Sequence, residues 1–399
     1  MSLELSQKAL QVKPSSTLAI TARAKELKSQ GVDVVGFGAG EPDFPTPGNI
    51  CEAAKKAIDD GFTKYTPAAG TQELRKAVAQ KFETFNHVHY DPSQVIICNG
   101  GKHALTNIFT AILNPGDEVI IPAPYWLSYP EMVKLAGGVP VFVYADAANG
   151  YKATAAQIEA AVTDRTKALV LNTPNNPTGA VYSRQELQAI ADAAVRKNFY
   201  VVADEMYEYL IYGDEEAVSI ASLGEEIYSR TITCSGLSKS YAMTGWRVGY
   251  LGAPAPIAKA ISAVQSHQTS NINSIAQKAA LEALTGPQDF IPKMKAAFEQ
   301  RRDYMVEAFR RMPHVSLSEP HGAFYAFVDC SEALGLSYRG KKLEDTTNLA
   351  RILLDEYHVA VVPCPDFGYP QFIRLSYALS LDDIKKGIGR IGDFLNALS

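Results

Sequence analysis

One stretch of the chain reads Ser235-Gly236-Leu237-Ser238-Lys239-Ser240-Tyr241-Ala242-Met243-Thr244-Gly245-Trp246-Arg247-Val248-Gly249-Tyr250. It sets a single lysine among small and hydroxyl-bearing residues, and an arginine follows eight positions later. A lysine amine can form a Schiff base with an aldehyde, while hydroxyls and a guanidinium suit a phosphate. Pyridoxal phosphate carries both groups. The alternative interpretation is a loop lysine with a nearby structural arginine.

The composition predicts a folded protein with an ample core. A chain of 399 residues exceeds one ordinary domain, so we expect two domains, or one large domain with a smaller one. Hydrophobic residues make up 47% and charged residues 20%, as in globular proteins. The formal net charge of −5 shows no basic excess, which argues against a nucleic-acid partner.

The N-terminus and the cysteines bear on the compartment. Residues 1–8 lack the apolar run of a secretory signal, and no stretch approaches the roughly 18 continuous apolar residues of a membrane span. The cysteines are odd in number, widely spaced and free of CxxC pairs, which argues against a disulfide framework or a zinc site: Cys51, Cys98, Cys234, Cys330 and Cys364. We therefore expect a soluble, cytoplasmic protein.

Short apolar runs alternate with helix-like runs through the first two thirds of the chain. Strands are expected at 95–99, 118–121, 139–144, 168–171 and 200–203, with helices at 102–113, 157–162 and 184–197. Such an order predicts an α/β fold with a mostly parallel sheet covered by helices on both faces. Ligands of such sheets bind beyond the carboxyl ends of the strands.

The pattern changes after residue 285. A long charged helix is expected at 290–311, further helices at 348–357 and 381–398, and strands at 323–328, 359–362 and 372–376. This order suits a smaller α/β domain. We expect a large domain at 48–285 and a small domain formed by 1–47 and 286–399, in which the N-terminal arm joins the small domain or clasps a partner chain.

Asp204 follows the apolar strand 200–203, and Tyr207 comes three residues later. A partly buried carboxylate is costly unless it meets a cation, and a protonated pyridine nitrogen is one. That ion pair would keep the ring an effective electron sink, and Tyr207 could bind its phenolic oxygen. The alternative is an aspartate that caps a helix.

Three further segments carry polar groups at predicted strand ends. Residues 172–179 hold two asparagines between prolines, which form either a simple loop or a rigid set of donors. Gly100-Gly101-Lys102 resembles a glycine turn that exposes backbone N–H groups to a phosphate, although alone it is a weak signal. Arg374 lies among apolar residues and needs an anion, either a substrate carboxylate or a structural salt bridge.

Taken in order, these motifs resemble the aspartate aminotransferase family, class I aminotransferases of the pyridoxal-phosphate fold-type I. The resemblance runs nearly end to end, from Gly40-Glu41-Pro42-Asp43-Phe44 through Lys64-Tyr65-Thr66-Pro67 to Arg374-Leu375-Ser376-Tyr377. The Asn-Asn-Pro-Thr-Gly loop and the Ser-Lys…Gly-Trp-Arg-Val-Gly segment are its most specific parts. It implies a large domain with a mostly parallel mixed sheet, a smaller α/β domain and a homodimer with shared active sites.

The resemblance also implies residue roles. Lys239 would be the Schiff-base lysine and, once released, the general base and acid. Asp204 would pair the pyridine nitrogen, while Tyr207 and Asn176 would hold the phenolic oxygen. Trp126 would stack on the ring, and Tyr65 would reach the phosphate across a dimer interface. The other implied phosphate ligands are Gly101, Lys102, Ser235 or Ser238, and Arg247. The implied substrate ligands are Gly40, Trp126, Asn176, Arg374 and Lys102.

The family pattern adds two details. It implies cis peptides before Pro124 and Pro177. Many members place a serine three residues before the lysine, where this chain has Gly236, so the hydroxyl that binds the phosphate stays open.

The implied reaction is ping-pong transamination, in which the freed lysine moves a proton between the substrate carbon and the cofactor carbon. A neutral amine is required, so we expect burial and Arg247 to lower the pKa of Lys239.

Substrate preference rests on fewer residues. Segment 265–271 holds no counterpart of the arginine that grips a distal carboxylate in the best-known members. Another, bacterial branch uses a lysine in the glycine turn with the N-terminal segment, which Lys102, Lys13, Ser15 and Thr17 match. We expect aspartate and glutamate with their oxo acids as substrates. The alternative is that Lys102 is a solvated helix-start lysine.

Other functions fit the same scaffold. An alanine, aromatic or prephenate aminotransferase, or a β-lyase, would share the removal of the α-proton. A regulatory module of a transcription factor is a different class, but no basic helix-turn-helix segment precedes Lys13.

Overall fold

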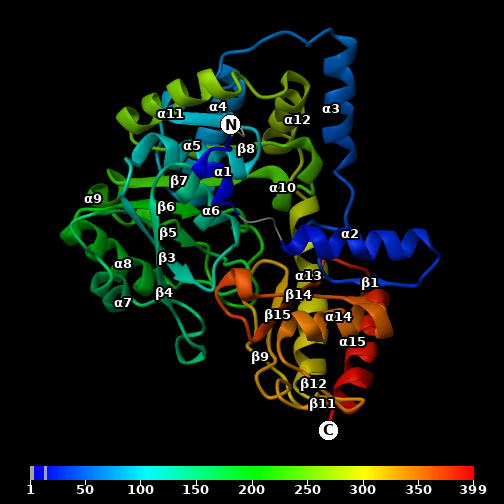
Figure 1. Ribbon diagram of the computed structural model, residues 1–399. Helices are drawn as coiled ribbons and strands as arrows, with labels where there is room; N and C mark the ends of the chain where they lie inside the picture. The colour runs from blue at the N-terminus through cyan, green and yellow to red at the C-terminus, as the bar shows by residue number, and fades with distance from the viewer. Residues whose placement is uncertain (1–3, 13–15) are drawn as a thin grey trace.

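The computed structural model describes residues 4–12 and 16–399. Its larger sheet has seven strands in the order β2-β8-β7-β6-β5-β3-β4 (Figure 1). Their bounds are Val95–Cys98 (β2), Glu118–Ala123 (β3), Val139–Tyr144 (β4), Thr166–Asn172 (β5), Tyr200–Asp204 (β6), Thr231–Gly236 (β7) and Gly249–Gly252 (β8). Strand β8 runs antiparallel to both neighbours, while the other pairs are parallel. The predicted mostly parallel, mixed sheet is confirmed.

Alternate residues of the central strands pack against helices on opposite faces. Val170 and Val202 face a core shared with α5 (Gly101–Ile112), α6 (Ser128–Leu135) and α11 (Ala255–Gln268). Leu169 and Val201 face a second core with α7 (Ala155–Ala160) and α8 (Arg184–Lys197). Because both faces are covered, the central stretches of these strands, 168–171 and 200–203, are apolar on both faces. A third core lies among β2 and the helices α3 (Gly48–Asp59), α4 (Gln72–Lys81) and α12 (Ser274–Thr285).

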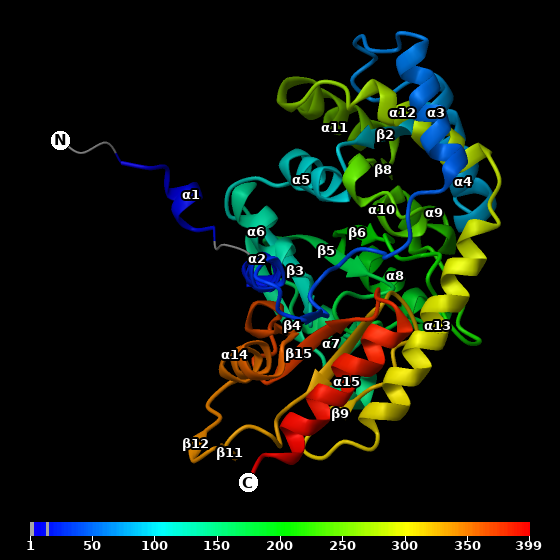
Figure 2. The ribbon, with the colours of Figure 1, turned by 90° about the vertical axis from the view of Figure 1, so that its right-hand side faces the viewer.

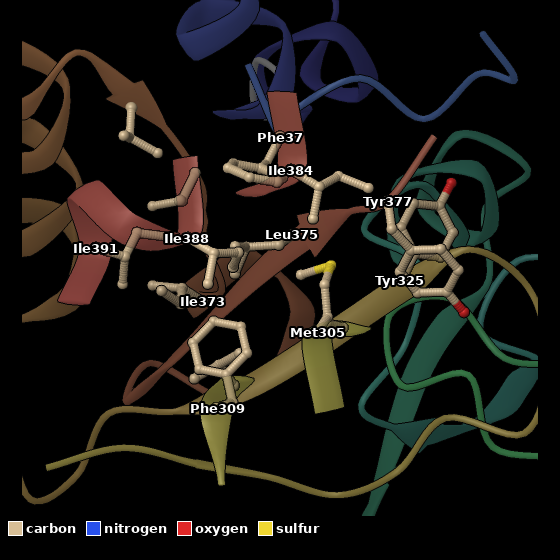
Figure 3. Close-up of a cluster of buried hydrophobic side chains, with 14 of the residues drawn as sticks. Phe37, Met305, Phe309, Tyr325, Ile373, Leu375, Tyr377, Ile384, Ile388 and Ile391 are labelled. Atoms are coloured by element: carbon tan, nitrogen blue, oxygen red, sulfur yellow. The ribbon is translucent and has the colours of Figure 1, made fainter. Parts of the chain in front are cut away.

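The second sheet is antiparallel and belongs to the C-terminal part of the chain. Its order is β14-β15-β10-β9, with bounds Val362–Pro363, Phe372–Ser376, Tyr325–Asp329 and Ser316–Leu317. Three helices accompany it, namely α13 (Phe290–Phe309), α14 (Thr346–Tyr357) and α15 (Leu381–Asn396). Figure 3 shows their shared apolar core, in which Ile384, Ile388 and Ile391 of α15 meet Ile373 and Leu375 of β15.

The N-terminal segment reaches this second part of the molecule. Strand β1 (Val35–Gly36) pairs in parallel with β13 (Val359–Ala360), and Phe37 enters the core shown in Figure 3. Helix α2 (Ser16–Ser29) lies beside the small sheet, while α1 (Gln7–Leu10) extends outward in Figure 2. This pairing joins the N-terminal segment to the C-terminal part of the chain, and the domain bounds stay a prediction.

Short elements complete the fold. They are α9 (Glu225–Tyr228), α10 (Leu237–Ser240), the hairpin β11 (Ser337–Tyr338) and β12 (Lys341–Lys342), a π-helical turn at Phe82–Asn86, and 3₁₀ turns at Pro92–Gln94, Ala147–Asn149, Ile220–Leu223, Thr244–Trp246 and Pro365–Phe367. No helix in the described ranges combines the length and apolar character needed to cross a membrane.

Two expectations change. The strand expected to end before Pro122 continues to Ala123. Beyond Ile120, β3 pairs only with β4. Pro122 lacks an N–H on the side of β5, where no partner strand lies, so it removes no hydrogen bond from the sheet. The cis peptides precede Pro124 and Pro174, so the expectation for Pro177 is wrong. Pro177 instead lies inside a turn closed by the Gly179 N–H, which donates to the Asn175 carbonyl at 2.9 Å.

Candidate active site

A cavity of about 280 Å³ opens at the carboxyl ends of β5, β6 and β7, where the small sheet faces the large one. The parallel register places Asn172 beside Asp204, and Asp204 beside Cys234. The lining residues come from both parts of the chain: Gly40, Gly101, Lys102, Leu105, Trp126, Leu127, Ser128, Tyr129, Asn172, Asn176, Asp204, Met206, Tyr207, Ser238, Lys239, Thr244, Arg247, Tyr325 and Arg374. Most of the residues predicted from the sequence therefore meet in one place.

Lys239 projects into this cavity from α10, directly after β7. Its ammonium nitrogen donates a hydrogen bond to the carbonyl oxygen of Gly40. Burial lowers the pKa of Lys239 to about 8 against the opposing effect of Glu41, and the positive charges of Arg374 and Arg247 add to the lowering. With a pKa of about 8, roughly a tenth of the amine is neutral at pH 7, far more than for an exposed lysine.

Asp204 is the last residue of β6 and is buried. Its Oδ2 accepts a hydrogen bond of 2.6 Å from the phenol of Tyr129, and its Oδ1 accepts one of 3.2 Å from the N–H of Met206. Burial raises its pKa, the more so because no cation among the described residues forms an ion pair with it. The segment that follows is a turn rather than a helix, so Asp204 is not a helix cap.

Arg374 stands in the centre of β15 and is buried. Its two terminal nitrogens donate to Asn176 Oδ1 at 3.0 Å and to the Gly38 carbonyl at 3.1 Å, while its Nε has no partner among the described residues. Within those residues no carboxylate pairs with it, so the alternative of a structural salt bridge is not observed. A buried guanidinium with neutral partners is suited to bind a carboxylate.

The start of α5 and Arg247 form a cationic corner of the cavity. Gly100 has a left-handed φ of 86°, and a Cβ there would stand 2.3 Å from Arg247 Nη2, so glycine lets the guanidinium lie against the turn. Arg247 also donates to the Thr244 carbonyl at 2.9 Å. Backbone N–H groups in the first turn of α5 have no acceptor within the helix. The corner suits a phosphate.

The two candidate serines lie differently. Ser238 lines the cavity. Ser235 is fully buried outside it, and its hydroxyl donates to Glu208 Oε1 at 2.6 Å. Of these two, the geometry therefore favours Ser238 as the hydroxyl near the cationic corner.

Lys102 borders the cavity beside Trp126, with its ammonium 5.0 Å from the ring centroid. Burial and then the charge of Arg247 lower its pKa. Tyr65 does not line the cavity and is 92% exposed. Lys13 and Ser15 lie outside the described residues, as does the side chain of Thr17.

Two tyrosines of the site escaped the sequence analysis. Tyr129 stands in the first turn of α6, whereas Trp126 precedes that helix, so the spacing of three residues between them carries no helical signal. Tyr325 comes from β10, and its hydroxyl is 2.9 Å from that of Tyr207. No local pattern links Tyr325 to Tyr207, because only the packing of the small sheet brings them together.

The cavity holds a donor set that fits pyridoxal phosphate. It offers one amine for the aldehyde, one buried carboxylate for the pyridine nitrogen and a cationic corner for the phosphate. Within the described residues, no cluster of three or more histidine, cysteine, aspartate or glutamate side chains could hold a metal ion.

Known proteins resemble the chain over nearly its whole length. Residues 32–391 match the family model "Aminotransferase class I and II". An aspartate aminotransferase of Bacillus sp. YM-2 is 48% identical over 96% of each chain, and an aspartate/prephenate aminotransferase of Cereibacter sphaeroides is 48% identical over 99% of each. The structure of the aspartate aminotransferase from Rhizobium meliloti superposes with a TM-score of 0.96 at 40% identity. That of the Thermus thermophilus aspartate aminotransferase with maleate superposes with a TM-score of 0.93 at 43% identity. Both superpositions cover at least 99% of each chain. The chain belongs to the class I and II aminotransferases and has their fold.

Proposed function

We propose that this protein is a pyridoxal-phosphate-dependent aminotransferase that takes the α-amino group from aspartate, passes it to 2-oxoglutarate and works as a homodimer. The observation that carries the proposal is the meeting of Lys239, Asp204 and Arg374 in one cavity. Lys239 can carry the proton, Asp204 is an anion for the ring nitrogen, and Arg374 is a cation for the substrate carboxylate.

The chemistry that pyridoxal phosphate supplies when bound is an aldehyde that holds the amino group and a ring that accepts the electrons left by the α-proton. Lys239 anchors this group and, when released, its Nζ takes the α-proton and returns it to the neighbouring carbon. The pKa of about 8 leaves enough neutral amine for that role. The Gly40 carbonyl orients Nζ through its hydrogen bond.

The remaining residues hold and orient. Asp204 would pair with the ring nitrogen as a carboxylate that Tyr129 keeps in place. Tyr207 and Asn176 would bind the phenolic oxygen, and Trp126 would stack on the ring. Arg374 would bind the α-carboxylate, because its buried guanidinium has only neutral partners.

The distal carboxylate of the substrate is assigned to Lys102. Its ammonium lies over Trp126 at the border of the same cavity that Arg374 lines. The names of the relatives, aspartate and aspartate/prephenate aminotransferases, support an acidic substrate. Tyr65, exposed in the single chain, is assigned to the phosphate of the partner site in a homodimer.

A second candidate activity is transamination of prephenate, favoured by the Cereibacter and Aquifex relatives that carry both names at 48% and 47% identity. Prephenate, like aspartate, has two carboxylates. Steady-state assays of the purified protein with 2-oxoglutarate and aspartate, alanine, phenylalanine or cysteine, and with prephenate as acceptor, test the proposal. We expect aspartate to have the highest kcat/KM among the donors. A higher value for alanine or phenylalanine would contradict the assignment.

A further inference from the structure

The turn that follows β6 has two faces. Asp204 and Tyr207 line the cavity, whereas Glu205 and Glu208, spaced by the same three residues, lie outside it. The two glutamates join Lys81, Asn86 and Ser235 in a group that we call the rear cluster. All five members are buried, with at most 7% exposed. Transamination as described above assigns none of them a role in the cavity.

Hydrogen bonds connect every member of the rear cluster. Lys81 Nζ donates to Glu208 Oε1 and, at 2.9 Å, to Asn86 Oδ1. Asn86 Nδ2 donates to Glu205 Oε2 at 2.8 Å and to Glu208 Oε2 at 2.7 Å. The π-helical turn Phe82–Asn86 delivers this asparagine, and such turns often mark functional places.

The charges of the rear cluster do not balance if both glutamates are ionised. Lys81 is its one cation among the described residues, and the other titratable groups that face Glu205 are Glu208, Asp204, Cys234 and Tyr90. Four aromatic rings surround the Lys81 ammonium at 5.1 to 5.7 Å, so water does not screen it. An uncompensated charge at such a place is costly.

The contacts decide which glutamate keeps a proton. Glu208 accepts from Lys81, Asn86 and Ser235, all of which favour the carboxylate. Glu205 accepts from the Asn86 amide and, outside the cluster, interacts with the Ser219 hydroxyl, but it makes no hydrogen bond with Lys81. Burial and then the charge of Glu208 raise the pKa of Glu205 to about 8.

The rear cluster also joins the two segments that carry the reacting groups. Glu208 follows Tyr207 directly, and Ser235 stands in β7 four residues before Lys239. The 2.6 Å bond from Ser235 to Glu208 therefore links the Asp204 turn to the strand that leads into Lys239. The N–H of Glu205, which donates to the Cys234 carbonyl at 2.8 Å, adds a second link.

We propose that the rear cluster positions the reacting groups from behind the cavity. Glu208 is its one ionised glutamate and holds the Asp204 turn against the Lys239 strand. Glu205 retains its proton, so that the cluster stays neutral. The effect on turnover rests on the proposed function, whereas the protonation of Glu205 does not.

The protonation is tested by unfolding the full-length protein in urea between pH 5 and 8. The folded state keeps a proton on Glu205 that the unfolded chain loses near pH 4.5, so wild-type stability falls as pH rises and the loss is complete near pH 8. Glu205→Gln, which is neutral at every pH, lacks this loss. We expect the wild-type unfolding constant to rise relative to that of Glu205→Gln by up to about tenfold per pH unit.

The matched control is Glu118→Gln. Glu118 is an equally buried carboxyl on β3, paired with Arg165 far from the cavity, and its pKa is lowered, chiefly by Thr163. In Glu118→Gln, stability should therefore fall with rising pH above pH 5 as it does in the wild type. Parallel wild-type and Glu205→Gln profiles overturn the protonation of Glu205.

The positioning is tested by steady-state kinetics of the holoenzyme with Ser235→Ala and Glu208→Gln. Misplacement of Lys239 against Asp204 affects proton transfer but not the carboxylate grip of Arg374. We therefore expect kcat to fall on the order of tenfold or more while the KM for aspartate stays within about twofold. Glu118→Gln leaves both constants unchanged.

Ser235→Ala keeps both charges of the rear cluster and serves if Glu208→Gln fails to fold. A folded Ser235→Ala variant with wild-type kcat overturns the positioning role. A wild-type protein without transaminase activity would contradict the proposed function instead, and the pH profiles would still decide the protonation of Glu205.

Discussion

The phenol of Tyr129 donates a 2.6 Å hydrogen bond to Oδ2 of Asp204, and both groups are buried at the floor of the cavity. This is the strongest side-chain contact that Asp204 makes, and it favours the ionised carboxylate against the cost of burial.

Tyr129→Phe should therefore weaken cofactor binding. Loss of the donor raises the pKa of Asp204 further and weakens its pairing with a pyridinium. A hydrogen bond to a charged group contributes about 1.5–3 kcal/mol, so the Kd for pyridoxal phosphate should rise roughly 10- to 100-fold. Absorbance titration of the apoprotein measures it. Tyr182→Phe removes an equally buried phenol that bonds to Ala153, and its Kd should stay unchanged.

Gly100→Ala tests the cationic corner. The new Cβ would meet Arg247 Nη2 at 2.3 Å and push the guanidinium away from the phosphate. Gly116→Ala is the control, because its φ of 89° is also positive while nothing lies within 4 Å of the new Cβ. Both variants should lose about 1 kcal/mol of stability. Only Gly100→Ala should weaken pyridoxal phosphate binding, and equal affinities in the two variants would refute the assignment of Arg247.

Arg374→Lys tests the grip on the α-carboxylate. A lysine cannot reproduce the planar fork that donates to Asn176 and Gly38 while leaving Nε free. The KM values for aspartate and 2-oxoglutarate should both rise at least about tenfold. Pyridoxal phosphate affinity should not change, since Arg374 is not assigned to the cofactor. Steady-state kinetics and absorbance titration separate the two effects.

Lys102→Ala tests the substrate class. Loss of the ammonium assigned to the distal carboxylate should raise the KM for aspartate far more than the KM for alanine, which lacks that group. Equal changes for the two amino acids would show that Lys102 does not read the side chain.

The pKa of Lys239 predicts how the apoprotein takes up its cofactor. Burial lowers this pKa to about 8, so the fraction of neutral amine that attacks an aldehyde reaches one half near pH 8 and levels off about one pH unit higher. The rate of pyridoxal phosphate uptake, followed by stopped-flow absorbance, should show this midpoint. A rate that keeps rising toward pH 10 would mean that Lys239 has the pKa of an exposed lysine.

Local patterns were enough to predict five of the seven strands of the large sheet and to single out Lys239 as the candidate anchor. The central residues of strands such as β3 and β6 are apolar because helices cover both faces, and that makes these strands recognisable in the sequence. Strands β7 and β8 were not predicted. Strand β7 mixes threonine with apolar residues, and in β8 a Cβ at Gly249 would stand 2.4 Å from the backbone of Gly100, so tertiary approach rather than propensity decides its residues.

The residues of the site also divide into those that the local sequence reveals and those that only tertiary contacts reveal. Lys239, Asp204 and Arg374 stand at strand ends or among apolar neighbours, where a polar side chain is conspicuous. Tyr325 and the rear cluster depend on contacts between segments more than 100 residues apart, such as Asn86 with Glu205. No spacing within one segment signals such pairs, and the burial that makes them matter exists only in the folded chain.

The central claim is that Lys239 anchors pyridoxal phosphate in this cavity. The direct measurement incubates the full-length protein with pyridoxal phosphate, reduces it with borohydride and locates the modified lysine by peptide mass spectrometry. The account predicts a visible absorption band before reduction, one pyridoxyl group per chain on Lys239, and neither signal in Lys239→Ala. No uptake of pyridoxal phosphate, or a label on another lysine such as Lys102 with Lys239 unmodified, would contradict it.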